Sequence, residues 1–197
     1  MKKFVLVGDA KVGKNSMHIT FITNIFPIGH LDLQVHMAHN HCCTIDINGE
    51  PHSFVMSAAD CGDGYDRLRP ISYPQTDAFL ACFSIANRES FDAVRSKWVP
   101  EIRYFCPDIP FLIVGTKIDL RDDSELIAEL ARQNKRLVRS EEGERLAFEL
   151  GAAKYVECST LTRNGLYNVF EEALILTLQP AVDEPPSEGQ KRACVVV

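Results

Sequence analysis

The chain has 197 residues, of which 46% are hydrophobic, and its formal net charge is −6. This length suffices for one domain with a hydrophobic core, and the composition excludes a collagen-like or wholly disordered protein. The negative charge argues against a general nucleic-acid binder, because the phosphate backbone would repel the protein. We expect a monomer that binds no nucleic acid.

The N-terminal segment and the cysteines bear on the cellular compartment. The apolar run after Lys3 ends at Asp9, which is too short for a signal peptide. No apolar run approaches the roughly 18 residues of a membrane-spanning helix. The seven cysteines are odd in number and scattered without framework spacing, which favours reduced thiols and a cytoplasmic protein.

Short β-rich runs alternate with longer helical patterns along the chain. A tight-turn signal at Asn48-Gly49 lies between two further strand patterns, Cys42–Ile47 and His52–Ser57, and predicts a hairpin. This order predicts an α/β fold with a doubly wound, mostly parallel sheet and one antiparallel edge strand. The strands expected to be buried on both faces are Phe4–Val7, Ala78–Ile85, Phe111–Val114 and Lys154–Glu157.

The helical patterns and the C-terminal composition define the expected domain. One helix opens after Gly13, another is bracketed by Ser140 and Gly151, and a third has apolar spacing from Leu166 to Thr177. From Gln179 onward, proline, serine and glutamate replace core residues. The sequence predicts one domain over residues 1–178 and a flexible tail over residues 179–197.

A candidate phosphate-binding loop follows the first predicted strand. Its sequence is Gly8-Asp-Ala-Lys-Val-Gly13-Lys14-Asn15, and it opens a helix. Gly8 and Gly13 allow the backbone to curl so that N–H groups face an anion. Lys14 supplies a positive charge, and the helix N-terminus adds its dipole. A glycine-rich strand-to-helix turn without a ligand is the alternative.

A candidate guanine-reading motif follows the Phe111–Val114 strand. Its sequence is Thr116-Lys117-Ile118-Asp119. The Asp119 carboxylate can accept hydrogen bonds from the ring N–H and the exocyclic amine of guanine, a donor pair that adenine lacks. Cys158-Ser159-Thr160-Leu161, after the last strand, would complete the base pocket.

These motifs resemble those of the Rho family within the Ras-like small GTPases. The resemblance extends over about residues 3–178 and is closest in Tyr65–Asp77, Val114–Asp123 and Glu157–Leu166. Asp122–Arg136 falls where Rho proteins carry an extra helix, and its composition suits an exposed amphipathic helix.

The resemblance implies a P-loop small GTPase fold, with GTP and GDP as ligands and Mg²⁺ as cofactor. It implies exchange factors, other Rho regulators and effectors as partners, and a signalling role linked to the actin cytoskeleton. The implied nucleotide-binding residues are Gly8, Ala10, Lys11, Val12, Gly13, Lys14, Asn15, Ser16, Phe26, Thr116, Lys117, Asp119, Leu120, Ser159, Thr160 and Leu161.

Two departures from the family pattern lie in the phosphate loop. Ala10 stands where the family has a glycine that leaves room for the hydrolytic transition state. Asn15 stands where the family has a hydroxyl ligand of Mg²⁺. A carboxamide oxygen coordinates less well at that position, so the expected Mg²⁺ site is weak.

Further departures lie in the two switch segments. The family threonine that closes over Mg²⁺ and the γ-phosphate corresponds to a residue within Leu33–His36, none of which replaces it. The second switch motif is degenerate: Ala58 takes the place of the Mg²⁺-organising aspartate and Gly62 that of the water-orienting glutamine. Asp60 is a substitute for that aspartate only after a local slip. We identify no catalytic residue and expect slow or absent GTP hydrolysis.

Two other segments carry chemistry of their own. His36–Cys43 contains three histidines and two cysteines, which could hold Zn²⁺ or Cu²⁺, although polar surface is the simpler interpretation. Cys194-Val-Val-Val197 has the form of a prenylation box. The tail lacks a basic run and a second cysteine, so we expect one lipid and an equilibrium between cytosol and membrane.

Several functions remain open at this point. The first interpretation is an operating GTP-dependent switch. The second is a binding module that titrates exchange factors through Arg67, Leu68 and Arg69, and Asn15 would favour the nucleotide-poor state that such a module needs. A third interpretation is a metal-binding regulator that uses His36–Cys43, and a fourth is a decayed copy that keeps only the fold.

Overall fold

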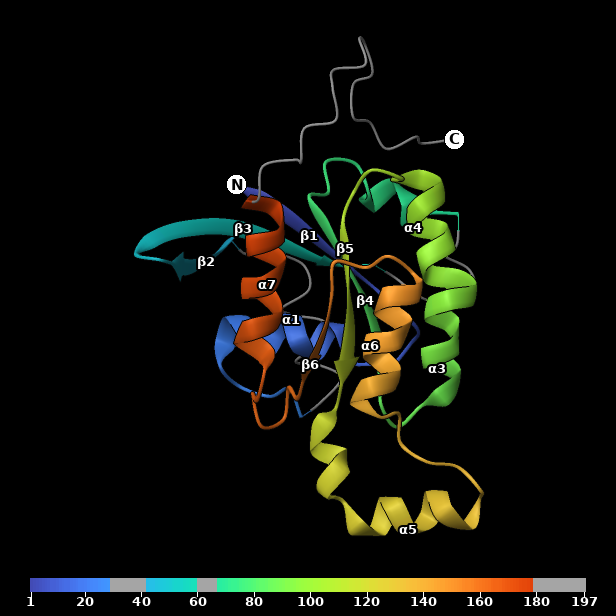
Figure 1. Cartoon of the computed structure of the whole chain (residues 1–197). Helices are drawn as coiled ribbons and strands as arrows, with labels where there is room; N and C mark the ends of the chain where they lie inside the picture. Colours follow the sequence, from blue (N-terminus) through green and yellow to red (C-terminus); the bar gives the residue numbers. More distant parts are fainter. Residues whose placement is uncertain (29–41, 60–66, 179–197) are drawn as a thin grey trace.

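The computed structural model describes residues 1–28, 42–59 and 67–178, and its centre is a six-stranded sheet in the order β2-β3-β1-β4-β5-β6 (Figure 1). All neighbouring pairs are parallel except β2 and β3, which form an antiparallel hairpin with β2 at the edge. The predicted fold class is therefore confirmed. The strands are β1 (Lys2–Val7), β2 (Cys42–Ile47), β3 (Glu50–Ala58), β4 (Ala78–Ser84), β5 (Phe111–Thr116) and β6 (Lys154–Cys158).

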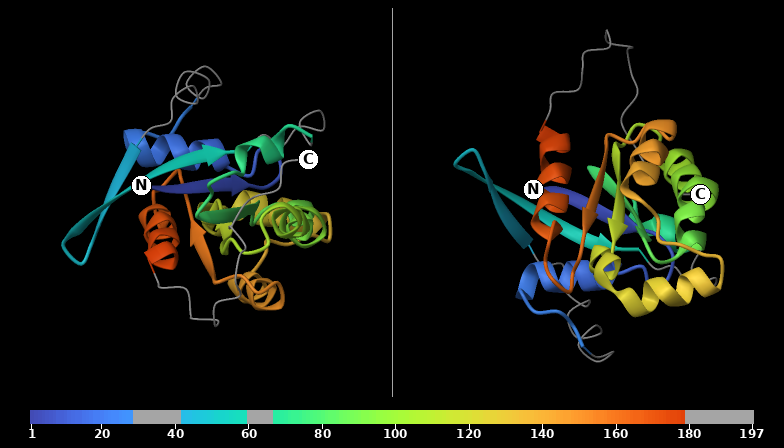
Figure 2. Two further views of the ribbon diagram at one scale, coloured as in Figure 1. Left: turned by 90° about the horizontal axis from the view of Figure 1, so that it is seen from above. Right: turned by 60° about the horizontal axis from the view of Figure 1, so that its bottom comes forward.

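Helices cover both faces of the sheet (Figures 1 and 2). One face carries α1 (Lys14–Thr23) and α7 (Leu166–Leu178), and the other carries α3 (Arg88–Ala93), the π-helical segment η3 (Val94–Trp98), α4 (Val99–Phe105) and α6 (Ser140–Glu149). Successive side chains of β1 point to opposite faces of the sheet and contribute to both hydrophobic cores. Phe4 and Leu6 pack in the core beneath α1 and α7, whereas Val5 and Val7 pack in the core on the other face.

The helical region α3–η3–α4 is not among the elements predicted from the sequence. Its N-terminus is nevertheless capped by a side chain, because the Ser90 backbone N–H donates to Asn87 Oδ1 at 3.0 Å. Val94, Trp98 and Ile102 are buried at a spacing of four residues, which is the helical signal in this stretch.

The segment resembling the Rho-specific insertion is helical. The short 3-10 helix η4 (Ile118–Asp122) leads into α5 (Ser124–Arg132), where none of the residues is buried. Asp123 caps α5 by accepting from the backbone N–H groups of Glu125 and Leu126. In Figure 1, α5 projects beyond the edge of the sheet to which the β5 arrow points.

The carboxyl ends of the parallel strands share this edge, and the N-terminus and the end of α7 lie at the opposite edge (Figure 1). The strand order places β1 between β3 and β4, so the chain winds outward on both sides of β1. In such sheets the crevice beyond the carboxyl ends of the central strands is where ligands bind.

Two findings concern the thiols and the helices. The expectation of reduced thiols throughout is wrong at Cys106, which is disulfide-bonded, whereas Cys42, Cys82 and Cys158 form no disulfide. Among the helices of the described residues, none has both the length and the apolar character needed to cross a bilayer.

Candidate functional site

The loop after β1 adopts the curled backbone that its two glycines predict. Gly8 and Gly13 have φ angles of 143° and 110°, and Gly13 is the N-cap residue of α1. A Cβ on Gly8 would lie 2.2 Å from the Cys82 carbonyl oxygen, so the loop could not pass β4 with a side chain there. The close packing of the expected phosphate loop against β4 therefore requires glycine at position 8.

Lys14 is buried inside this loop. Its Nζ donates to the carbonyl oxygens of Gly8 at 2.6 Å and Asp9 at 2.8 Å. Burial raises the pKa of the neighbouring Cys82 thiol to about 12, although the Lys14 charge opposes the shift. The Cys82 thiol therefore stays neutral, so the Lys14 ammonium is not paired with a thiolate. Its partners are carbonyl dipoles, which leave its positive charge available for an anion.

Hydrogen bonds join the end of β5 and the loop after it directly to the phosphate loop. The Thr116 hydroxyl lies 2.5 Å from the carbonyl oxygen of Val12 and 2.9 Å from that of Phe83. Lys117, in the left-handed region at φ 63°, donates from Nζ to the Lys11 carbonyl at 2.8 Å. The bonds to Val12 and Lys11 join residues more than one hundred positions apart in the sequence.

Asp119 lies near both base-pocket loops. Burial lowers the pKa of the Lys117 ammonium, and the Asp119 carboxylate opposes that shift. Burial also raises the pKa of the Cys158 thiol, and Cys82, Glu157 and Asp119 act in the same direction. The Asp119 charge therefore acts on Lys117 beside it in the chain and on Cys158 at the end of β6.

The loop after β6 is held by its own hydrogen bonds. The Ser159 N–H donates to Asn164 O at 2.8 Å, and Ser159 Oγ accepts from the Thr162 N–H at 3.1 Å. Ser159 and Thr160 are buried, whereas Leu161 is exposed. Gly165, at φ 70°, permits the close return of the chain, because a Cβ there would lie 2.2 Å from Glu157 O.

A charged clamp that was not predicted from the sequence connects these two loops. Arg121, two residues after Asp119, forms two hydrogen bonds with Glu157, two residues before Ser159, at 2.6 and 2.7 Å. The Tyr155 hydroxyl also donates to Glu157, at 2.6 Å. The only signal in the sequence is a carboxylate within a strand predicted to be buried, which requires a partner. That prediction is only partly met, because Lys154 is exposed and Tyr155 and Glu157 are half-buried.

Tyr155 reaches Glu157 because two glycines leave space for its ring. A Cβ on Gly115 would lie 2.3 Å from the Tyr155 hydroxyl oxygen, and one on Gly143 would lie 2.2 Å from the ring. These glycines come from β5 and α6, so the clamp depends on elements distant in sequence.

The structure joins most, but not all, of the expected nucleotide-binding residues. The phosphate loop (residues 8–16) and the loops that contain Thr116–Leu120 and Ser159–Leu161 meet at the carboxyl edge, as described above. Phe26 is half-buried beyond the end of α1, and none of the interactions within the described ranges joins it to Thr116 or Asp119. The expected residues Leu33–His36, Asp60, Gly62 and Cys194 lie outside the described residues.

Two described positions at which the family resemblance puts Mg²⁺ ligands carry other side chains. Asn15, in the first turn of α1, offers a neutral carboxamide oxygen. β3 ends at Ala58 beside Leu6 of β1, so a methyl group stands where the family resemblance puts a carboxylate. Within residues 1–28, 42–59 and 67–178, no group of three or more His, Cys, Asp or Glu side chains could hold a metal ion.

One expected surface residue is buried instead. Arg69, in the 3-10 helix η2 (Arg69–Ser72), is 3% exposed and forms a two-bond ion pair with Glu101. The expectation that Arg69 contributes to a docking surface is therefore wrong, because its guanidinium is buried and bonded to Glu101. Leu68 and Ile71 on either side are 55% and 60% exposed.

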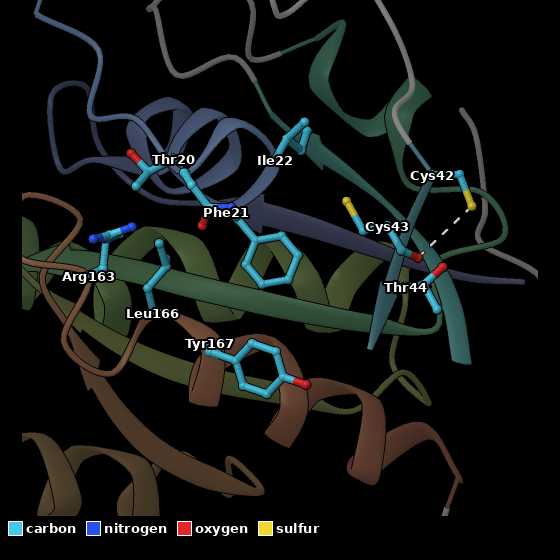
Figure 3. A pocket seen from close by; sticks show the side chains of 10 residues that line it. Thr20, Phe21, Ile22, Cys42, Cys43, Thr44, Arg163, Leu166 and Tyr167 are labelled. Atoms are coloured by element: carbon cyan, nitrogen blue, oxygen red, sulfur yellow. Dashed lines mark hydrogen bonds between the residues drawn. The ribbon is translucent and has the colours of Figure 1, made fainter. Parts of the chain in front are cut away.

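A separate pocket, of about 430 Å³, lies between α1, β2 and α7 and contains none of the expected nucleotide-binding residues (Figure 3). Phe21 and Tyr167 line it, and Cys43 borders it on β2. Cys42 is exposed, and alternation along β2 places the two adjacent cysteines on opposite faces of the strand. His36, His39 and His41 of the proposed metal segment lie outside the described residues, so that hypothesis stays a prediction.

The clamp predicts a specific effect of Glu157→Gln. Burial would raise the pKa of Glu157, but the bonds from Arg121 and Tyr155 outweigh burial and hold it below its ordinary value of about 4.5. The ionised carboxylate therefore stabilises the fold above about pH 4.5, and this contribution is lost as the pH falls through the lowered value. We expect Glu157→Gln to cost about 1–3 kcal/mol of unfolding free energy near neutral pH.

Urea unfolding at several pH values measures this effect. The difference between the parent and Glu157→Gln should narrow as the pH falls below about 4.5, because the parent side chain becomes protonated. Glu172→Gln is the matched control, since Glu172 pairs with Lys154 at the surface and its loss should cost about 0.5 kcal/mol or less. Equal effects of the two substitutions would contradict a structural role for the clamp.

The comparison with known families agrees with the geometry of the site. The model of the Ras family matches residues 3–179, a range that reaches all six strands and every described site residue. This match indicates guanine-nucleotide binding and a role in signalling, with Mg²⁺ as the general cofactor of the family. The chain belongs to the Ras family of small GTPases.

Proposed function

We propose that this chain is a Rho-like GTP-binding protein of signal transduction that hydrolyses GTP slowly or not at all. One contrast within the site carries the proposal. Thr116 and Lys117, at the guanine-reading motif, are hydrogen-bonded to the phosphate loop, and Arg121 joins this motif to Glu157 of β6. The positions expected to organise Mg²⁺ and the γ-phosphate carry Ala10, Asn15 and Ala58 instead.

The assignment to the Rho branch is supported by α5. This exposed helix lies between β5 and α6, where the sequence resembles the insertion of Rho proteins. A link to the actin cytoskeleton follows from that resemblance and is part of the same proposal.

Weak hydrolysis follows from the chemistry of phosphoryl transfer. The reaction depends on positioning and on neutralisation of charge on the transferred phosphate, for which the metal is central. Asn15 supplies a neutral ligand in place of a hydroxyl, and Ala58 supplies no ligand. Lys14 still supplies a positive charge that can face the phosphates.

A binding module that titrates exchange factors is the second candidate. Arg67 and Leu68, just before η2, and Ile71 within it are exposed. Such a surface suits an apolar docking partner, and Asn15 would favour the nucleotide-poor state that exchange factors bind.

Reversible membrane association through Cys194 is part of the proposal. A single prenyl group gives only marginal membrane binding, so the protein would distribute between the cytosol and the cytoplasmic face of a membrane. The sequence support is the terminal Cys194-Val-Val-Val197.

Titration with fluorescent GDP and GTP, with and without Mg²⁺, tests the central proposal. We expect both nucleotides to bind, chelation of Mg²⁺ to change their affinity little, and single-turnover assays to release little phosphate. Asn15→Thr should increase the Mg²⁺ dependence at least about tenfold, because a direct ligand contributes no less than an outer-shell partner. Tight Mg²⁺-dependent binding with ready hydrolysis by the parent would contradict the proposal.

Asp119→Asn tests whether Asp119 reads the base. An asparagine amide can donate to the carbonyl that xanthine carries in place of the guanine amine, so preference should shift from GDP to xanthosine diphosphate by about tenfold or more. Competition against fluorescent GDP measures the shift. Asp123→Asn is the control, because asparagine retains the capping role of Asp123. An unchanged base preference in Asp119→Asn would refute the assignment.

Detergent phase partitioning after expression in a eukaryotic cell tests the lipid anchor. The parent should enter the detergent phase in part, and Cys194→Ser should remain in the aqueous phase, because it lacks the acceptor thiol. Cys42→Ser removes another exposed thiol and should partition like the parent. Identical partitioning of the parent and Cys194→Ser would exclude the anchor.

A further inference from the structure

Trp98 forms a hydrogen bond with the phosphate loop. It is the single tryptophan of the chain, ends η3 and is 1% exposed. Its indole Nε1–H donates to Asp9 Oδ1 at 2.7 Å. Asp9 follows Gly8 directly, so a residue from the opposite layer of the fold fixes the first side chain of the loop.

Asp9 is also held through its backbone. Its carbonyl oxygen accepts from Lys14 Nζ at 2.8 Å, so the residue is fixed at both its side chain and its main chain. The position of Asp9 therefore affects the position of the ammonium group that faces the phosphates. Removal of the indole N–H would leave a partly buried carboxylate without this donor and free the loop to shift.

Trp98 also contacts a charged cluster that includes Arg69, the neighbour of the exposed Leu68 in the chain. The guanidinium of Arg69 lies 4.7 Å from the centre of the indole ring, and Arg69 forms its ion pair with Glu101. The Tyr73 hydroxyl also donates to Glu101. A continuous set of contacts thus extends from Asp9 through Trp98 to Arg69 and Tyr73.

We propose that Trp98 is a positioning residue for phosphate binding, which holds Asp9 in the phosphate loop and couples that loop to Arg69. The inference takes its ligand, the diphosphate of a guanine nucleotide, from the proposed function. A partner that docks on Leu68 and Ile71 and displaces Arg69 would then alter phosphate affinity through Trp98, without touching the nucleotide.

Trp98→Phe removes the indole N–H and keeps an aromatic ring for Arg69. The first measurement needs no nucleotide: backbone ¹⁵N order parameters of residues 9–13 should fall from about 0.85 towards 0.6. Tyr73→Phe is the matched control, because it removes a hydroxyl from the same cluster without contact with Asp9, and it should leave these values unchanged. Unchanged order parameters in Trp98→Phe, or an equal fall in Tyr73→Phe, overturn the inference.

The second measurement compares the affinities for GDP and GMP by competition. Trp98→Phe should weaken GDP about 3- to 10-fold and affect GMP less, because Lys14, held by Asp9, reaches the β-phosphate that GMP lacks. Asp9→Ala combined with Trp98→Phe should be no weaker than Asp9→Ala by itself. Parallel losses for GDP and GMP overturn the inference. If the parent binds neither nucleotide, the proposed function fails, and the order parameters still decide the role of Trp98.

Discussion

Hydrogen bonds from the loop after β5 to the carbonyl groups of the phosphate loop hold the site together. Thr116 reaches Val12, and Lys117 reaches Lys11. Both acceptors belong to a backbone that must curl away from regular structure, so their carbonyl groups have no helix or sheet partner of their own. These bonds satisfy the acceptors and place the base-reading residues at a fixed distance from the phosphate-binding lysine.

The two halves of the site differ in how they are supported. The base pocket is supported by the buried Ser159 and by half-buried groups with partners, namely the Tyr155 hydroxyl and the Arg121–Glu157 pair. At the metal side, the described residues present Asn15 and the methyl group of Ala58. A buried pair is costly to break because the remaining partner loses its counter-charge, whereas an oxygen ligand of a metal can be replaced without loss of the fold. This difference explains how the fold and base pocket can persist while the metal site changes.

Two sets of long-range side-chain contacts support the loops of the site. Glu157 and Tyr155 join β6 to η4 and α6, and this connection lies behind the base pocket. Trp98 reaches Asp9 from η3 and lies behind the phosphate loop. The second connection ends at Arg69, which lies in the sequence between the exposed Leu68 and Ile71. The phosphate loop is therefore the part of the site that is linked through side-chain contacts to η2.

Local sequence patterns were sufficient to predict the fold class and the positions of the phosphate and base loops. Alternating and continuous apolar runs predict buried parallel strands, and glycine spacing before Lys14 predicts a curled loop, because both signals depend on local backbone geometry. The hairpin at Asn48-Gly49 and the helix within Asp122–Arg136 were likewise predictable from local signals and are confirmed. The tertiary structure decided which charged residues became structural. Arg69 was expected at the surface and is buried against Glu101, while Glu157, Trp98 and Asp9 acquire their roles from partners 36 to 89 residues away and from glycines on other elements. Partners so distant leave no periodic signal in the sequence, because side-chain pairing depends on how the layers pack and not on local spacing.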